Sequence, residues 1–227
     1  MIPLPDFDVV IVAGGAGARL AASRPKAFVE LAEKPLFMHC LEVFERHALT
    51  TRIILVVPGD MVSQTETILS TLKVRKNIFV AEGGKERWLS VQSGVSHSSA
   101  EWVMVHDAAR PFVTGAVIDA IVQKASTYDA IITATPETDT VRYFEADHCC
   151  ETIDRAKLIR VGTPQLFRVN LLKEAFSMAA AMPSPPTDEA MLIEKMGIPV
   201  GVAWGDPINF KITTQSDLRL AEALCRK

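Results

Sequence analysis

Short apolar runs rich in β-branched residues recur along this chain, and most are followed by a longer segment with apolar residues at helical spacing. The short runs predict buried strands at residues 9–12, 52–57, 77–81, 102–105, 130–134 and 199–204. The longer segments predict helices at residues 35–48, 61–72, 88–95, 116–125, 170–181, 190–196 and 214–224. This alternation predicts an α/β fold in which a mostly parallel, Rossmann-like sheet carries helices on both faces.

The pattern changes in residues 135–155, where two alternating stretches flank a turn at Ala146-Asp147. Alternation on both sides of a turn predicts a β-hairpin that protrudes from the α/β body as an arm. On pattern alone, an ordinary surface hairpin explains this segment equally well. No internal repeat, low-complexity tract or linker divides the sequence, so residues 1–227 are interpreted as one domain.

A glycine-rich turn follows the first predicted strand. Its small residues let backbone N–H groups approach an anion closely: Ala13, Gly14, Gly15, Ala16 and Gly17. Arg19 adds a bidentate phosphate ligand, and Lys26 adds a mobile point charge. The turn therefore predicts a polyphosphate site. A tight strand–helix junction without a ligand is the alternative, but such a junction has no need of two cations.

Two standard phosphate-binding motifs do not fit this turn. A P-loop requires Lys-Ser or Lys-Thr after its last glycine, where this sequence has Ala18-Arg19. The dinucleotide fingerprint requires Gly or Ala at its last position, where Leu20 stands, and no acidic residue follows at the spacing that holds a ribose. A dehydrogenase is therefore disfavoured.

Two further polar segments follow predicted strands. Gly83 and Gly84 belong to a second glycine turn, and the run H-D-A-A-R-P from His106 to Pro111 follows the strand at residues 102–105. Ligands bind beyond the carboxyl ends of parallel strands, so we expect all three segments to meet at one edge of the sheet. His106 is expected to be packed and hydrogen-bonded, and not to be a metal ligand.

Composition and charge restrict the class of protein. The formal charge of −3 over 227 residues gives no general attraction to nucleic acid or to a membrane surface. No apolar run approaches membrane-spanning length, and the N-terminus has no signal-peptide pattern. The four cysteines and five histidines lack zinc-binding spacing, and the cysteines are interpreted as reduced. We expect a cytoplasmic protein, or a stromal one after removal of a transit peptide if the source has plastids.

Eight short motifs occur in an order that is typical of one enzyme family. They are A-G-G-A-G-A-R with R-P-K, G-G-K-E-R-W-L-S, V-H-D-A-A-R-P, D-T at Asp139, T-I-D-R, T-P-Q, T-D-E-A and N-F-K-I-T. Over almost its full length the chain resembles the 2-C-methyl-D-erythritol 4-phosphate cytidylyltransferase (IspD) family of the non-mevalonate isoprenoid route. The resemblance implies a nucleotidyltransferase fold, a homodimer, and transfer of CMP from CTP to a small polyol phosphate with Mg²⁺ or another divalent metal.

The resemblance also implies roles for individual residues. The implied catalytic residues are Arg19, Lys26, Arg155 and Lys211. Both glycine turns, with Ser90 and the Ala108 backbone, would frame the nucleotide, and Asp107 would hold the metal directly or through water. The residues implied for the second substrate are Arg110, Thr140, Arg155, Thr163 and Thr187. Some of these would come from the arm of the partner subunit, which makes residues 135–155 an expected dimerisation arm.

Alternatives to these roles stay open on the sequence alone. Ile208 stands where relatives can carry an acidic residue near the metal, and Asp206 is the alternative second ligand. Asp107 could cap the next helix, Arg110 could form a structural ion pair, and Lys211 could be a solvated lysine. A ribitol 5-phosphate cytidylyltransferase, or a non-catalytic CTP-binding protein, would share many of the motifs.

Overall fold

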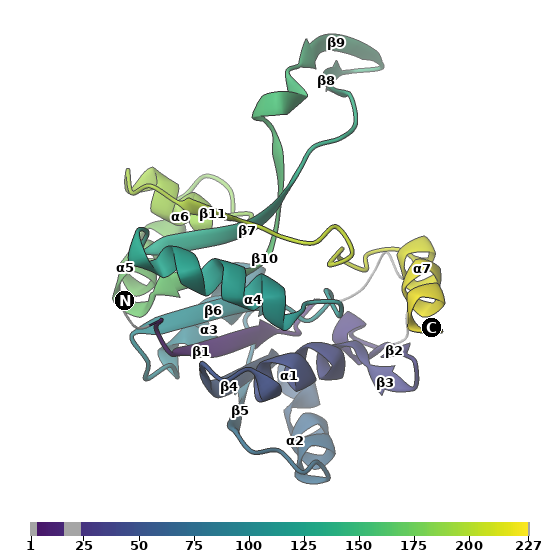
Figure 1. The fold of residues 1–227 in the computed structure, drawn as a ribbon, viewed down its shortest axis with the longest axis vertical. Helices are drawn as coiled ribbons and strands as arrows, with labels where there is room; N and C mark the ends of the chain where they lie inside the picture. Colours follow the sequence, from purple (N-terminus) through teal and green to yellow (C-terminus); the bar gives the residue numbers. More distant parts are fainter. Residues whose placement is uncertain (1–3, 16–23, 227) are drawn as a thin grey trace.

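A seven-stranded sheet forms the centre of the fold in the computed structural model, which describes residues 4–15 and 24–226 (Figure 1). The strand order across this sheet is β11-β7-β10-β6-β1-β4-β5. Its strands are β1 (Phe7–Val12), β4 (Thr50–Val57), β5 (Asn77–Glu82), β6 (Trp102–Asp107), β7 (Ala130–Pro136), β10 (Ile159–Arg168) and β11 (Gly201–Trp204). β10 runs antiparallel to both neighbours, and the other neighbouring pairs are parallel. The predicted mostly parallel α/β sheet is confirmed.

Helices cover both faces of this sheet. On one face lie α1 (Leu36–Arg46), α2 (Val62–Ser70) and α4 (Gly115–Val122), and on the other α3 (Arg87–Ser96), α5 (Val169–Ala179) and α6 (Ala190–Lys195). α7 (Gln215–Cys225) packs beside a small hairpin of β2 (Glu30–Leu31) and β3 (Lys34–Pro35). The 3-10 helices are η2 (Lys26–Phe28), η3 (Gly59–Met61), η4 (Gln123–Ser126) and η5 (Arg155–Lys157). Among the described residues, no helix is long and apolar enough for a bilayer crossing.

The alternation of side chains along the strands divides the core between the two faces. Val9 and Ile11 of β1 belong to the buried cluster under α1, α2 and α4. Val10, between them, belongs to the cluster under α3, α5 and α6. A strand covered on both faces needs apolar residues at every position, which is why the short continuous runs predicted this sheet.

The sequence patterns do not predict β10, although it lies in the middle of the sheet. Gly162, Thr163 and Pro164 interrupt it, and a proline inside a run argues against a central strand because it lacks a ladder donor. Here the register with β7 shifts between Gly162 and Gln165, so Pro164 falls within the irregularity. Its carbonyl accepts a hydrogen bond from Oγ1 of Thr133 at 2.6 Å. The short β2–β3 pairing is also absent from the prediction.

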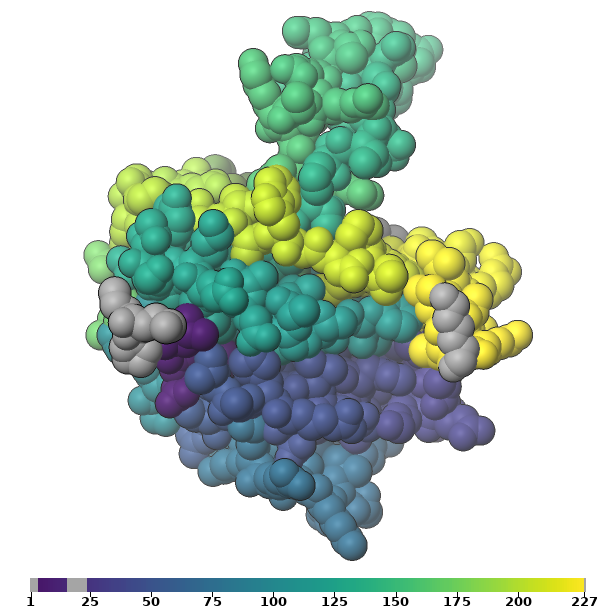
Figure 2. All heavy atoms as spheres, in the orientation of Figure 1, coloured from purple at the N-terminus to yellow at the C-terminus, as the bar shows by residue number. Residues whose placement is uncertain are grey.

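The predicted hairpin arm is present and stands away from the body (Figures 1 and 2). β8 (Val141–Glu145) and β9 (His148–Ile153) pair antiparallel as a separate two-stranded sheet. Ala146 lies at the predicted turn with a φ of 54°. Tyr143 and Phe144 on β8 are 59% and 68% exposed. The protruding arm is confirmed, and its contact with a second subunit stays a prediction.

Candidate active site

The segments that follow β1, β5 and β6 meet at one edge of the sheet and surround a cavity of about 470 Å³. The segment after β11 reaches the same cavity through Lys211 and Thr213. The predicted site residues that line it are Ala13, Gly14, Gly15, Lys26, Gly84, Ser90, Asp107, Ala108 and Lys211. The fold therefore brings together residues that the sequence separates by up to two hundred positions, and the predicted meeting of the three segments is confirmed.

The first glycine turn reaches this cavity through Gly14 and Gly15. Lys26 lines the same cavity, and its backbone N–H donates to the Gly15 carbonyl at 3.1 Å, which brings the two ends of the intervening segment together. The predicted residues of this turn that lie outside the described residues are Ala16, Gly17 and Arg19. Their roles in phosphate binding stay predictions.

The second glycine turn is packed against the first turn of α3. Ser90 accepts a hydrogen bond at its Oγ from the Gly84 N–H at 3.1 Å. A Cβ on Gly83 would lie 2.9 Å from that Oγ, and a Cβ on Gly84 would collide with Leu89. Close packing therefore requires glycine at both positions. Ala108, on the opposite segment, donates its N–H to the Val12 carbonyl at 3.0 Å, which fixes the backbone that faces the cavity.

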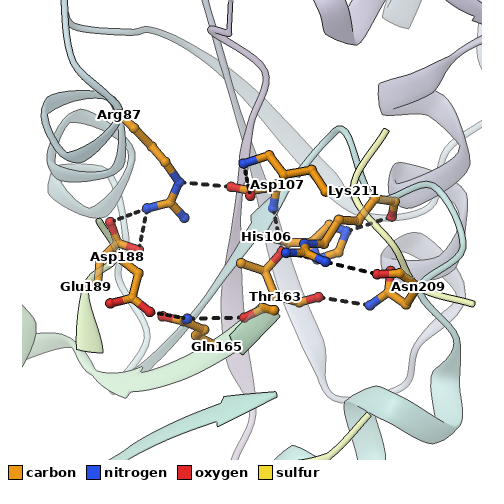
Figure 3. Close-up of polar contacts among 11 residues, drawn as sticks. Arg87, His106, Asp107, Thr163, Gln165, Asp188, Glu189, Asn209 and Lys211 are labelled. Atoms are coloured by element: carbon orange, nitrogen blue, oxygen red, sulfur yellow. Dashed lines mark hydrogen bonds and ion pairs between the residues drawn. The ribbon is translucent and has the colours of Figure 1, made fainter. Parts of the chain in front are cut away.

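Asp107 lies at the end of β6 between two cations (Figure 3). Its Oδ1 accepts from Nε of Arg87 at 3.0 Å, and its Oδ2 accepts from Nζ of Lys211 at 2.8 Å. Arg87 also donates through Nη1 to both carboxylate oxygens of Glu189, at 2.8 and 2.9 Å. Asp107 and Glu189 are 7% and 0% exposed. We call these four residues the Asp107 cluster: Arg87, Asp107, Glu189 and Lys211.

The charges of the cluster keep Asp107 ionised. Burial alone would raise the pKa of Asp107, but the positive charges of Arg87 and Lys211 outweigh it and hold that pKa well below its usual range. Two alternatives from the sequence are wrong. Asp107 does not cap the next helix, because Thr114 caps α4, and Lys211 is not simply solvated, because it pairs with Asp107.

His106 and Thr163 support the cluster from inside the sheet. The Nε2 of His106 lies 3.1 Å from the Arg110 carbonyl, and since a carbonyl only accepts, we assign the ring proton to Nε2. The Thr163 hydroxyl then donates to Nδ1 at 3.2 Å and accepts from the Asp107 N–H at 3.0 Å. Burial lowers the pKa of His106 to about 4, so the ring is neutral at pH 7. The expectation of a packed, hydrogen-bonded histidine is confirmed.

A second cavity, of about 200 Å³, shares a wall with the first. Arg87, Asp107 and Lys211 line both. Residues predicted to contact the second substrate also line it: Arg110, Thr163 and Thr187. Their convergence beside the Asp107 cluster is a finding of the structure, and their contact with a substrate stays a prediction. The hydroxyl proton of Thr163 is already used by His106.

Arg110 also lines this second cavity, and a main-chain group holds its side chain. Its Nη1 donates to the Asn209 carbonyl at 3.0 Å, and a Cβ on Gly162 would lie 3.4 Å from the same atom. Its Nε is buried without a hydrogen-bond partner among the described residues. Burial lowers the pKa of Arg110, against the opposing charge of Asp107. In the described part of the chain Arg110 forms no ion pair at contact distance, so the structural ion-pair role is not observed.

Three predicted residues lie away from these two cavities. Thr140 and Arg155 are exposed in the arm, where Nη1 of Arg155 donates to the Thr138 carbonyl at 2.7 Å. Asp206 lines a neighbouring cavity of about 280 Å³, and its Oδ1 accepts from the Ile208 N–H at 2.9 Å. Within the described residues no hydrogen bond joins Asp206 to Asp107.

The donors around Asp107 decide how a metal ion could be held there. The described residues contain no group of three or more His, Cys, Asp or Glu side chains suited to a metal. Mg²⁺ commonly uses one or two carboxylates together with substrate phosphates and water. Asp107 supplies one carboxylate, which already accepts from Arg87 and Lys211. With both oxygens of this carboxylate engaged, the described residues fit Mg²⁺ only where nucleotide phosphates and water supply the remaining ligands.

Sequence reasoning assigned no role to Arg87 or to Glu189. Both belong to motifs that carried the resemblance, G-G-K-E-R-W-L-S and T-D-E-A, but Arg87 stood there only as the end of the second glycine turn and Glu189 only at a helix start. The available signal was weak, because the motifs contain several charged residues without an assigned role, and Arg87 and Glu189 are only two of them. Their contact spans 102 residues, so no local pattern reports it.

Comparison with known proteins decides the family. The family model for IspD, 2-C-methyl-D-erythritol 4-phosphate cytidylyltransferase, matches residues 7–227. The chain belongs to this family. A 2-C-methyl-D-erythritol 4-phosphate cytidylyltransferase from Bacillus licheniformis is 38% identical over 220 residues, which cover 96% of this chain and 95% of the relative. One from Geobacillus kaustophilus is also 38% identical over 220 residues, with 96% of each chain covered.

Solved structures of the IspD family share the fold. A 4-diphosphocytidyl-2C-methyl-D-erythritol synthase from Anaerococcus prevotii superimposes with a TM-score of 0.86 at 26% identity, covering 99% of this chain and 100% of the other. A 2-C-methyl-D-erythritol 4-phosphate cytidylyltransferase from Thermus thermophilus gives a TM-score of 0.80 at 29% identity, covering 98% and 100%. The resemblance seen in the sequence is confirmed, and with it the nucleotidyltransferase fold and the transferase class.

Proposed function

We propose that this chain transfers CMP from CTP to 2-C-methyl-D-erythritol 4-phosphate, forming 4-diphosphocytidyl-2-C-methyl-D-erythritol and pyrophosphate. The observation that carries the proposal is the wall of Arg87, Asp107 and Lys211 shared by two cavities. The larger cavity, between the two glycine turns, takes CTP, and the smaller one takes the acceptor. The two substrates then meet at the shared wall, as a direct transfer requires.

The reaction needs placement and charge relief more than proton transfer. An oxygen of the acceptor phosphate forms a bond to the α-phosphorus, while the bond from that phosphorus to the β-phosphate bridging oxygen breaks and its electrons leave with pyrophosphate. A phosphate monoester with a second pKa of about 6 is largely ionised at neutral pH, so no strong general base is required. Lys211 and Lys26, which line the nucleotide cavity, supply positive charge where the phosphates crowd.

Arg110 is the proposed ligand for the acceptor phosphate within this chain. Arg110 lines the acceptor cavity beside the Asp107 cluster. A phosphate oxygen is a suitable partner for its guanidinium, since Arg binds phosphate in a planar, bidentate way. Thr187, exposed on the same cavity, offers a hydroxyl to the acceptor.

A divalent metal, Mg²⁺ in the first instance, is part of this proposal. Bound with CTP, such an ion would neutralise part of the triphosphate charge. Asp107 is the residue that would hold it, directly or through water, because it is the ionised carboxylate that lines both cavities. Asp206 has no such position, since it lines the neighbouring cavity.

We further propose that a second copy of this chain completes the acceptor cavity. Thr140 and Arg155 are exposed in the arm, and neither lines the cavities of its own chain among the described residues. Tyr143 and Phe144 expose large apolar side chains on the same arm, as is common where a partner covers a surface. An arm that reaches the second subunit would bring the Arg155 cation to an acceptor phosphate.

Release of pyrophosphate from CTP and Mg²⁺ tests the proposal, with methylerythritol phosphate and ribitol 5-phosphate as alternative acceptors. The family match supports the first acceptor, so we expect release with methylerythritol phosphate and little with ribitol 5-phosphate. Release with ribitol 5-phosphate alone would keep the chemistry and replace the acceptor. CTP binding without release in either case would favour a non-catalytic CTP-binding protein.

A further inference from the structure

Arg87 joins three elements that are far apart in the sequence. It is the first residue of α3, directly after the second glycine turn. Its Nε reaches Asp107 at the end of β6, and its Nη1 reaches Glu189 at the start of α6 (Figure 3). A single guanidinium thus links the second glycine turn, the Asp107 carboxylate at the wall shared by both cavities, and the turn that carries Thr187, which we call the acceptor-side turn.

Glu189 is fully buried, and both of its carboxylate oxygens accept from Arg87. It is not among the described residues that line the nucleotide or acceptor cavity. The preceding residue, Asp188, accepts from the Met191 N–H and from Nε2 of Gln165, each at 3.0 Å. The acceptor-side turn that carries Thr187 is therefore tied to β10 by Asp188 and to the Asp107 cluster by Glu189.

We propose that Arg87 and Glu189 form a positioning pair that holds Asp107, and through it Lys211, in register with the acceptor-side turn. This inference rests on the proposed function. The planar guanidinium presents N–H groups on separate nitrogens, in fixed directions, to two carboxylates at once, whereas a lysine ammonium carries its donors on a single rotating nitrogen. Glu189 orients Arg87, and Arg87 directs Oδ1 of Asp107 away from Lys211, so that Oδ2 holds the Lys211 ammonium at the shared wall. Glu189 acts on the reaction only through Arg87.

Steady-state kinetics of two conservative variants test this pair. Glu189→Gln keeps the shape of the side chain and removes its negative charge. Arg87→Lys keeps the positive charge and removes the planar guanidinium that contacts both carboxylates. Glu194→Gln is the matched control, because Glu194 is exposed on the same helix and loses the same charge. For each protein, kcat, the KM for methylerythritol phosphate, the Kd for CTP from calorimetry and the thermal midpoint are measured. Glu189→Asp, which restores the charge, serves as the rescue variant.

We expect Glu189→Gln and Arg87→Lys each to lower kcat about tenfold or more and to raise the acceptor KM, with the CTP Kd within about threefold of the parent. Glu189→Asp should recover part of kcat. Kinetic constants of Glu189→Gln equal to those of Glu194→Gln would overturn the proposal. So would failure of both conservative variants to fold, or a loss that follows the thermal midpoint alone, because either result assigns the pair a purely structural role. A parent protein that releases no pyrophosphate overturns the proposed function itself, and this inference with it.

Discussion

The Asp107 cluster and the arm hold their polar residues in different ways. In the cluster, Asp107 and Glu189 are buried, and each is paired with at least one cation. In the arm, Arg155 donates to a main-chain carbonyl, and Tyr143 and Phe144 are exposed. One part of the proposed site is thus fixed by the chain's own packing. The other part is presented on a hairpin that contacts the body little.

This difference follows from the environments of the two regions. Buried charges are tolerated only when their partners are in place, so the cluster must be arranged before a substrate arrives. A two-stranded hairpin buries little apolar surface and has little stability of its own. The comparison supports the proposals that the Asp107 cluster is arranged within one chain before substrates bind and that association with a second copy completes the acceptor cavity.

Removal of the Lys211 charge should give the largest effect on the cluster. Lys211→Met is expected to lower kcat about a thousandfold, because it removes a cation aimed at developing charge. The free energy of unfolding should fall by a smaller amount, about 2 kcal/mol, since the Lys211 side chain is partly exposed but buried Asp107 then shares Arg87 with Glu189. Pyrophosphate release and urea unfolding measure the two quantities.

Lys124→Met is the matched control for this experiment, because Lys124 is exposed in η4, away from both cavities. It should retain the parent kcat. If the Lys211→Met enzyme kept near-parent activity, Lys211 would have no part in the mechanism. The Asp107 cluster would then not supply a cation that is in place before substrates bind.

The pH dependence of folding stability tests the effect of burial at His106. Its pKa is lowered by burial to about 4 in the folded state, against 6.5 for an ordinary histidine, so the unfolded chain takes up a proton first as the pH falls. The stabilisation is complete above pH 6.5 and is lost toward pH 4, a change on the order of 3 kcal/mol. A His106→Gln variant should therefore show a shallower fall in unfolding free energy over this range, measured by urea titration.

His148 gives the contrast within the arm, because its side chain is exposed on β9. His148→Gln is the same substitution at this exposed position, and its pH slope is the reference for that of His106→Gln. An equal change in slope for both variants would show that burial is not what separates the two regions.

The sequence predicted the part of the site that depends on strand ends. Asp107 and the glycine turns follow parallel strands, and that topology alone brings them to one edge. The Arg87–Glu189 pair was out of reach, because two charged residues at helix starts look solvent-exposed until the tertiary fold buries them together. The β10 strand was missed for a related reason: Pro164 argues against a central strand unless the register shift that accommodates it is known.

The two exposed aromatic residues of the arm, Tyr143 and Phe144, should contribute less than either Lys211 or His106. Tyr143→Ser with Phe144→Ser removes two large exposed side chains that a second copy would cover. The loss of about 2 kcal/mol of association energy corresponds to a rise of about thirtyfold in the dimer dissociation constant. Sedimentation velocity over a dilution series measures this constant, and the activity of the variant should recover as its concentration is raised.

Leu220→Ser is the control for the arm, since Leu220 is similarly exposed but lies on α7. It should leave the dissociation constant unchanged. A parent chain that is fully active as a monomer at assay concentration would contradict the association half of the comparison.

The smallest effect is expected at the cap of α7, which follows Lys211 closely. Asp217 accepts hydrogen bonds from the N–H groups of Thr213 and Thr214, each at 2.7 Å. Burial raises the pKa of Asp217, but these hydrogen bonds outweigh burial and lower that pKa to about 2. Asp217→Asn should cost about 1 kcal/mol at pH 7, and the cost should disappear as the pH falls from about 4 to about 2, measured against Glu222→Gln. Turnover should stay within about twofold, because Asp107 holds Lys211. A tenfold loss of turnover would instead mean that α7 places this lysine, and the cluster would then depend on its surroundings as much as the arm does.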